Sequence, residues 1–163
     1  MSVDDTEQPR FTVRRRIAVG LSIAIVAGLL THFLIPVIEE FLAPPAVEIT
    51  SPVDGGQVQW TPVGHLVTGT CRKVGGNLRL YVAIHPLATE NWYVQRIPTV
   101  IDSHWQAVVF FGMEEIGVGD QYELCAFISS ETLHEGQTIP LTAFPPSHEA
   151  KAIIAVSRPA THN

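Results

Sequence analysis

The chain has 163 residues, and its 16 acidic side chains outnumber its 10 Lys and Arg, which gives a formal net charge of −6 at pH 7. Residues 46–158 hold no cluster of basic side chains, so the sequence argues against nucleic-acid binding, which needs a basic footprint. The same distribution argues against a basic surface that binds acidic lipid headgroups.

An apolar run near the N-terminus predicts a membrane anchor. Residues 17–38 form a run of 22 residues with no Asp, Glu, Lys or Arg, and a spanning helix needs roughly 20 apolar residues to cross the hydrocarbon core. Residues 1–16 are too few and too polar to fold, so we expect a disordered tail there. The sequence thus predicts one transmembrane α-helix in the lipid bilayer, preceded by a short tail.

The charges on either side of this run predict its orientation. Arg14, Arg15 and Arg16 stand directly before it, whereas the first basic residue after it is Arg72. Lys and Arg are retained on the cytoplasmic side of spanning helices. We therefore expect a single-pass protein of the cell membrane, with a cytoplasmic N-terminus and a C-terminal domain in the periplasm or at the cell surface. The arginine cluster disfavours the alternative, an inverted protein with a cytosolic β domain.

A cleaved secretory signal is the second alternative to an uncleaved anchor. The apolar region of such a signal spans only about 7–15 residues and ends at a small-x-small site. Here the run is longer, and the best candidate site, Phe41-Leu42-Ala43, has a bulky residue where a small one is required. The pattern therefore favours an uncleaved signal anchor.

Small residues form one stripe along the predicted helix. Gly20, Ala24 and Gly28 are spaced four apart, and small residues at that spacing let two helix backbones approach closely in a membrane. The stripe predicts association through this face, either as a homodimer or with the helix of another membrane protein. The alternative is that the stripe has no role in association and only reflects composition, because Gly is common in spanning helices.

Downstream of the anchor the pattern changes to short strands. Residues 39–45 form a stalk, because its Pro pair cannot continue the helix, and residues 159–163 are expected to be a disordered tail. In between, segments rich in β-branched and aromatic residues alternate with turn residues. We predict strands over residues 46–50, 57–60, 64–73, 77–85, 91–97, 103–112, 120–129 and 152–158. Seven or eight short, evenly spaced strands are typical of an all-β sandwich, with residues 130–151 as the hairpin between the last two strands.

Two of these strands alternate clearly enough to predict a core. Side chains at every second position of a strand share a face. In the strand 77–85, the first face holds Leu78, Leu80, Val82 and Ile84, and the opposite face holds Arg79, Tyr81 and Ala83. In the strand 103–112, Trp105 shares a face with Ala107, Val109 and Phe111, so we expect Trp105 in the core.

The soluble part also resembles a known module. The residues that carry the likeness are Ile49-Thr50-Ser51-Pro52 with Asp54-Gly55-Gly56, Val67-Thr68-Gly69, the strand 78–84, Trp92, Asp102-Ser103-His104-Trp105 before Phe110-Phe111-Gly112, and Gly119-Asp120-Gln121-Tyr122 leading into Leu124 and Ala126. In this pattern the stretch 46–158 is similar to immunoglobulin-like or fibronectin-III-like modules of bacterial membrane and surface proteins. The resemblance implies an immunoglobulin-like antiparallel β-sandwich of about seven strands, a fold that hosts many roles.

The two cysteines only partly fit the antibody-type pattern. In that family the corner Tyr stands two residues before the cysteine, but Tyr122 stands three residues before Cys125. On a regular strand Tyr122 and Cys125 therefore take opposite faces, whereas Cys71 shares the expected core face with Val67. A disulfide between the sheets needs a bulge that shifts the register, and two free thiols are the alternative.

The sequence predicts no catalytic residue, metal site or cofactor. The histidines His65, His85, His104, His134 and His148 show no metal-ligand spacing. Ser147-His148-Glu149 cannot form a triad because neighbours on a strand point to opposite faces. We therefore expect a protein that is not an enzyme. An enzyme of an unfamiliar type would bring together several of His65, His85, His104, Glu114 and Glu149 in one cleft.

Two adjacent aromatic residues are the candidate binding surface. Trp92 and Tyr93 follow one another on a predicted strand, so one of them should face outward and offer a platform for a protein or a sugar. The alternative is packing beneath residues 86–90 or at a sheet edge. Together these features predict a membrane-anchored extracytoplasmic domain that serves as a non-catalytic binding or assembly module for a protein partner. The alternative function is an accessory or sensor subunit that acts on a membrane complex through its helix.

Overall fold

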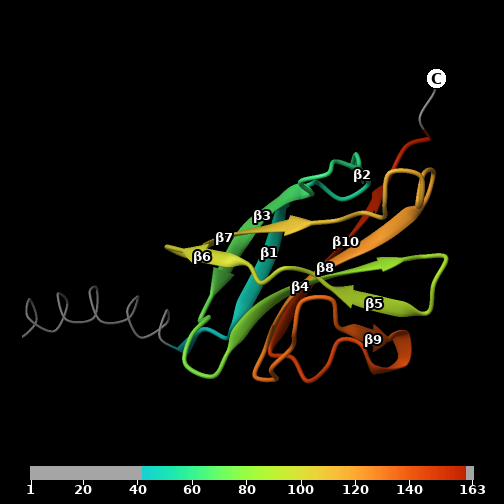
Figure 1. Ribbon diagram of the computed structural model, residues 1–163. Helices are drawn as coiled ribbons and strands as arrows, with labels where there is room; N and C mark the ends of the chain where they lie inside the picture. Colours follow the sequence, from blue (N-terminus) through green and yellow to red (C-terminus); the bar gives the residue numbers. More distant parts are fainter. Residues whose placement is uncertain (1–41, 161–163) are drawn as a thin grey trace, which may run out of the picture. The chain divides into compact units, whose positions relative to one another are not determined.

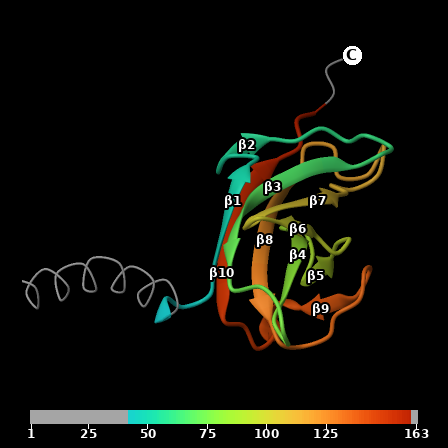
Figure 2. The ribbon, with the colours of Figure 1, turned by 90° about the vertical axis from the view of Figure 1, so that its left-hand side faces the viewer.

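Two β-sheets make up the part of the chain that the computed structural model describes, residues 42–160 (Figures 1 and 2). The four-stranded sheet has the order β1 (Ala46–Ser51), β3 (His65–Arg72), β7 (His104–Val109) and β6 (Thr99–Ile101). The six-stranded sheet has the order β2 (Gly56–Gln57), β10 (Ala150–Ser157), β8 (Gln121–Ser129), β4 (Arg79–Pro86), β5 (Asn91–Val94) and β9 (Thr138–Pro140). A 3-10 turn, η1 (Leu141–Ala143), follows β9. Neighbouring strands run antiparallel except for the short β2–β10 pair.

The predicted all-β class is confirmed for the described residues. Each predicted strand contains or overlaps an observed one, and seven observed strands have four residues or more. The prediction missed β6 and β9, which have only three residues each. Strand β6 depends on the two-residue turn Asp102-Ser103, whose φ angles are +47° and +66°. Positive φ at both positions is typical of the tight turns that close hairpins.

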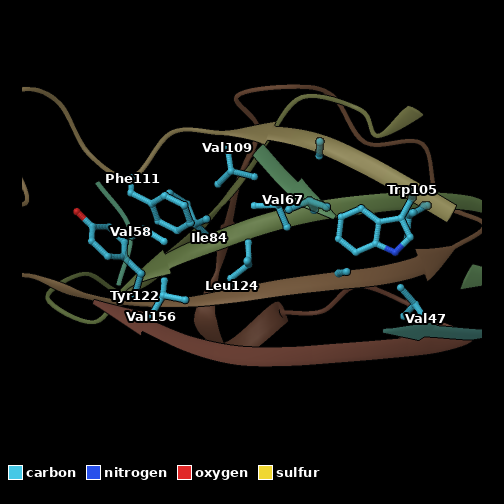
Figure 3. Packing of buried hydrophobic residues seen from close by; sticks show 14 of the residues in the cluster. Val47, Val58, Val67, Ile84, Trp105, Val109, Phe111, Tyr122, Leu124 and Val156 are labelled. Carbon is cyan, nitrogen blue, oxygen red and sulfur yellow. The ribbon is translucent and has the colours of Figure 1, made fainter. Parts of the chain in front are cut away.

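The first hydrophobic core lies between the two sheets, and aromatic rings occupy both of its ends (Figure 3). Trp105 and Val47 lie at one end, and Phe111 and Tyr122 lie at the other. The indole N–H of Trp105 donates to the carbonyl oxygens of Glu48 at 3.2 Å and Thr70 at 3.1 Å. The prediction that Trp105 belongs to the core is therefore confirmed.

A second hydrophobic core covers the outer face of the six-stranded sheet. Strands β4 and β8 are buried on both faces, because residues 130–149 leave β8, pair with β5 through β9, and return to start β10. Tyr81 and Phe127 pack there with Trp92, whose ring stacks on Phe144 at a centroid distance of 3.9 Å. Strands β8 and β10 are antiparallel neighbours, as predicted, but their connection is a covering layer that the sequence analysis did not foresee.

Both cysteines are buried and unpaired. Cys71 belongs to the first core and Cys125 to the second, on the opposite face of the six-stranded sheet from Tyr122. The register argument from the Tyr122–Cys125 spacing thus holds, and the described residues form no disulfide between the sheets. Burial raises the pKa of Cys125 to about 12 and also raises the pKa of Cys71.

Several sequence predictions lie outside the described residues. They are the tail 1–16, the transmembrane helix 17–38, the topology residues Arg14, Arg15 and Arg16, the stripe Gly20, Ala24 and Gly28, and the last three residues of the tail 159–163. Within residues 42–160, no helix has the length and apolar character needed to cross a membrane.

Candidate functional site

A cleft of about 550 Å³ is the candidate site. It is bounded by the β4–β5 hairpin of the six-stranded sheet and by the connection from β7 to β8, residues 110–120. Most of its lining is apolar or aromatic, including Ile84, Tyr93, Phe110, Met113 and Ile116, and a few polar side chains join them. Binding sites for small groups are usually concave, mostly apolar and roughly 300–1,000 Å³ in volume.

The first wall is the β4–β5 hairpin, and a buried histidine holds its turn in place. His85 Nδ1 lies 3.0 Å from Glu123 Oε2, and His85 Nε2 lies 2.8 Å from the carbonyl oxygen of Thr89. The Thr89 carbonyl oxygen can only accept, so His85 Nε2 is the donor in the second contact. The first contact is a hydrogen bond when a hydrogen lies between His85 Nδ1 and Glu123 Oε2. The His85 ring also packs on Trp92, at a centroid distance of 5.2 Å. These contacts fix the turn that carries Pro86, Ala88 and Thr89, which line the cleft.

The second wall is the 110–120 connection, and it is held by Arg158, just after β10. The Arg158 side chain is buried, and its guanidinium donates to the carbonyl oxygens of Phe111, Met113, Glu114 and Ile116. No carboxylate of the described residues forms an ion pair with it. Backbone carbonyl dipoles therefore compensate the buried charge, which ties the connection to the last strand.

Two glycines let this connection fold closely onto the core. Gly112 and Gly117 have φ angles of +75° and +89°, which favour glycine. A Cβ at Gly112 would lie 2.3 Å from the carbonyl oxygen of Ile116, and a Cβ at Gly117 would lie 2.1 Å from the Tyr122 hydroxyl. Burial, and then the charge of Asp120, raise the pKa of Tyr122, whereas Arg158 lowers it. The Tyr122 hydroxyl is therefore a neutral group beneath the cleft at physiological pH.

Gln95 joins the two walls. Its side-chain Nε2 donates to the carbonyl oxygen of Tyr93 at 3.1 Å, and its Oε1 accepts the backbone N–H of Phe110 at 3.0 Å. Near it, Arg96 and Glu135 form an exposed ion pair with an Nε–Oε1 distance of 3.6 Å. An exposed pair of this kind contributes little to stability, but it places charge beside an apolar cleft.

The structure separates the two candidate binding aromatics. Tyr93 is half-buried and lines the cleft. Trp92 is only 2% exposed, so the expectation that it could serve as an exposed platform is wrong. Adjacent residues do take opposite faces of β5, but residues 130–149 cover the face on which Trp92 lies.

The residues considered for catalysis do not meet in this cleft. None of His65, His85, His104, Glu114 and Glu149 lines it. No group of three or more His, Cys, Asp or Glu within residues 42–160 is arranged to hold a metal ion. Sequence reasoning missed Arg158 and Asp120 as parts of the site, because nothing in the local pattern shows that the 110–120 connection, which includes Asp120, folds against Arg158.

No protein-family model matches the chain, and no curated protein matches it.

Proposed function

We propose that the chain is a single-pass membrane protein with an immunoglobulin-like β-sandwich, residues 46–158, that acts outside the membrane as a non-catalytic binding or assembly module. The cleft is the site at which this module binds a protein partner. The observation that carries the proposal is the cleft itself, an apolar hollow of about 550 Å³ with walls fixed by Gln95 and Arg158.

The surface around the cleft supports a protein partner. Met113 and Ile116 in its lining are 67% and 64% exposed. Leu87 and Ile97, which adjoin lining residues in the chain, are also exposed. Grouped apolar side chains on a protein surface are typical of interaction sites, and a rigid site loses less conformational entropy on binding than a mobile one.

Topology is the first part of the proposal to test. Protease added to intact cells, or to spheroplasts if the protein is periplasmic, should digest residues 46–158 and leave the N-terminal part protected. The arginine cluster is the physical reason, because it holds the N-terminus in the cytoplasm. Digestion only after the cell membrane is opened would contradict the proposed orientation.

A cleft-filling variant tests the binding site. Ala88 is exposed and lines the cleft, so Ala88→Trp should block it without disturbing either core. Ala143→Trp is the matched control, because Ala143 is equally an exposed alanine but lies outside the cleft. Partners cross-linked in membranes and identified by mass spectrometry should include a protein that is lost with Ala88→Trp and retained with Ala143→Trp. Identical cross-linked proteins for the wild type and both variants would refute the cleft as the binding site.

The second candidate function is an accessory or sensor subunit that acts through its transmembrane helix. The stripe of Gly20, Ala24 and Gly28 favours it, since small residues at this spacing support close helix contact. Replacing all three with Leu should then abolish association in the membrane while Ala88→Trp leaves it intact. The opposite result would favour the cleft.

A further inference from the structure

We propose that the cleft accepts a Lys or Arg side chain of the protein partner, presented between apolar residues, with Asp120 as the group that receives its positive charge. This inference rests on the proposed function and deepens it. Its support comes from the carboxylate of Asp120, from the balance of charge at the cleft, and from the apolar walls.

The backbone of Asp120 is held by two hydrogen bonds, whereas its carboxylate has no hydrogen-bond or ion-pair partner within residues 42–160. Its backbone N–H donates to the carbonyl oxygen of Gly117 at 3.2 Å, and its carbonyl oxygen accepts the N–H of Arg158 at 2.9 Å. Its half-buried carboxylate lines the cleft but makes no hydrogen bond or ion pair with any residue of the described range 42–160. A half-buried carboxylate beside an apolar surface is a ready acceptor for a cationic donor, and such charge-assisted bonds are stronger than neutral ones.

The charges around Asp120 also favour a cation. Glu114 and Glu115 are exposed between the lining residues of the 110–120 connection. Glu135, in the connection from β8 to β9, also lines the cleft and pairs with Arg96. With Asp120 these make four carboxylates, against the two cations Arg96 and Arg158, so the formal balance is −2. The Arg158 guanidinium is already bonded to four carbonyl oxygens. A negative site attracts a basic partner and orients it during the encounter.

The apolar lining suits the rest of a basic side chain. Lys and Arg carry a long hydrocarbon stem that packs on apolar surface while the charged end reaches a polar partner. Tyr93 and Phe110 offer aromatic faces for that stem and for the cation. The exposed Met113 and Ile116 would then contact the apolar neighbours of the basic residue, and Met adapts easily to different partners.

The test uses the full chain in lipid nanodiscs and two synthetic probes, acetyl-Leu-Lys-Phe-amide and acetyl-Leu-Gln-Phe-amide. Surface plasmon resonance, with empty nanodiscs as the blank, gives the affinity of each peptide. We expect the Lys peptide to bind about tenfold more tightly than the Gln peptide, as one charge-assisted bond in a half-buried site would give. Added salt should reduce this preference, because it screens the charges.

Substitutions assign the preference to Asp120. Asp120→Asn keeps the size of the side chain and removes its charge, so the two peptides should then bind to within about twofold of each other. Asp102→Asn removes one charge at an exposed hairpin turn outside the cleft, and it should preserve the tenfold preference. Ala88→Trp should weaken both peptides by filling the cleft.

Three results would overturn the inference: equal binding of the two peptides, a Lys preference that survives Asp120→Asn, or no detectable Lys-peptide binding at about 1 mM. These results leave the proposed function standing if Ala88→Trp still removes a cross-linked protein from the membrane. A different pair of results is that Ala88→Trp leaves the cross-linked proteins unchanged while the Lys preference still depends on Asp120. That pair of results would refute the cleft as the partner site, but the cleft would still be shown to bind a basic side chain through Asp120.

Discussion

The two ends of the first core contain similar aromatic side chains but are built differently. At the Trp105 end, the indole ring packs against Gly69 so closely that a Cβ there would lie 2.5 Å from the ring, and its N–H has two carbonyl partners. At the Tyr122 end, the hydroxyl donates a long hydrogen bond of 3.4 Å to the carbonyl oxygen of Gly117, and Tyr122 also lines the cleft.

The two ends therefore differ in what they shape: the Trp105 end joins the two sheets, and the Tyr122 end forms part of the cleft. The Trp105 end is closed by hydrogen bonds and packing between residues of the sheets themselves. The Tyr122 end is closed by a connection that Arg158 ties down from the last strand. A small sandwich can thus form a cleft at one end of its core while the other end keeps the two sheets together.

Trp105→Ala should have the largest effect. Removing a large aromatic ring from a packed core costs about 3–5 kcal/mol of unfolding free energy, and two carbonyls at this end would also lose their donor. Guanidinium unfolding followed by circular dichroism measures the loss. Leu66→Ala serves as the control, because this exposed side chain of β3 should change stability by less than about 0.5 kcal/mol. Equal losses in the two variants would remove the distinction between the core end and the surface.

Arg158→Met should destabilise the protein by about 2–3 kcal/mol, because four carbonyl oxygens lose a charged donor and some of them are buried. Arg158→Met should also weaken binding of the Lys peptide, since the cleft wall is no longer held. Trp105→Ala should not weaken this binding when the two variants are compared under conditions in which they are equally stable. Thermal unfolding and the peptide assay measure the two effects. The control is Arg79→Met, which removes an exposed arginine of β4. A destabilised Arg158→Met protein with unchanged peptide affinity would show that Arg158 does not shape the cleft.

The second core offers an alkaline test that leaves both ends of the first core intact. Burial raises the pKa of Cys125 from 9.0 to about 12. Between these values the unfolded state loses the thiol proton before the folded state does, so stability falls as pH rises from about 9 to about 12. At pH 10 the loss amounts to about 1 kcal/mol. The unfolding free energies of the wild type and of Cys125→Ala are measured at pH 8 and pH 10. The variant should lack the part of the loss that comes from ionisation of this thiol in the unfolded state. An identical pH dependence of the two proteins would contradict a buried neutral thiol.

Tyr122→Phe should have the smallest effect. The lost hydrogen bond is long, so stability at pH 7 should fall by only about 0.5 kcal/mol. Because the folded pKa of Tyr122 is raised, the unfolded state ionises first above about pH 10 and stability decreases with rising pH there. The Phe variant should lose stability less steeply than the wild type in that range. A steeper loss would mean that the hydroxyl ionises more easily in the folded protein.

The sequence by itself determined the all-β class, the main strands, and which side of the strands 77–85 and 103–112 enters the first core. The reason is that the two-residue period of a strand is local, so Leu80, Val82 and Ile84 reveal a shared face without knowledge of their partners. The same two-residue period placed Tyr122 and Cys125 on opposite faces of β8. The predicted anchor at 17–38 rests on a local signal of the same kind and lies outside the described residues.

Only the tertiary structure decided which faces are exposed and where the cleft lies. The alternation of side chains along a strand predicts that Trp92 and Tyr93 lie on opposite faces. The covering residues 130–149 decided that Trp92 is buried. The contacts of Arg158 with the 110–120 connection cross more than 40 positions of the chain. A lone arginine after a strand carries no local mark of such distant partners, so the walls of the cleft appear only once the sheets are packed together.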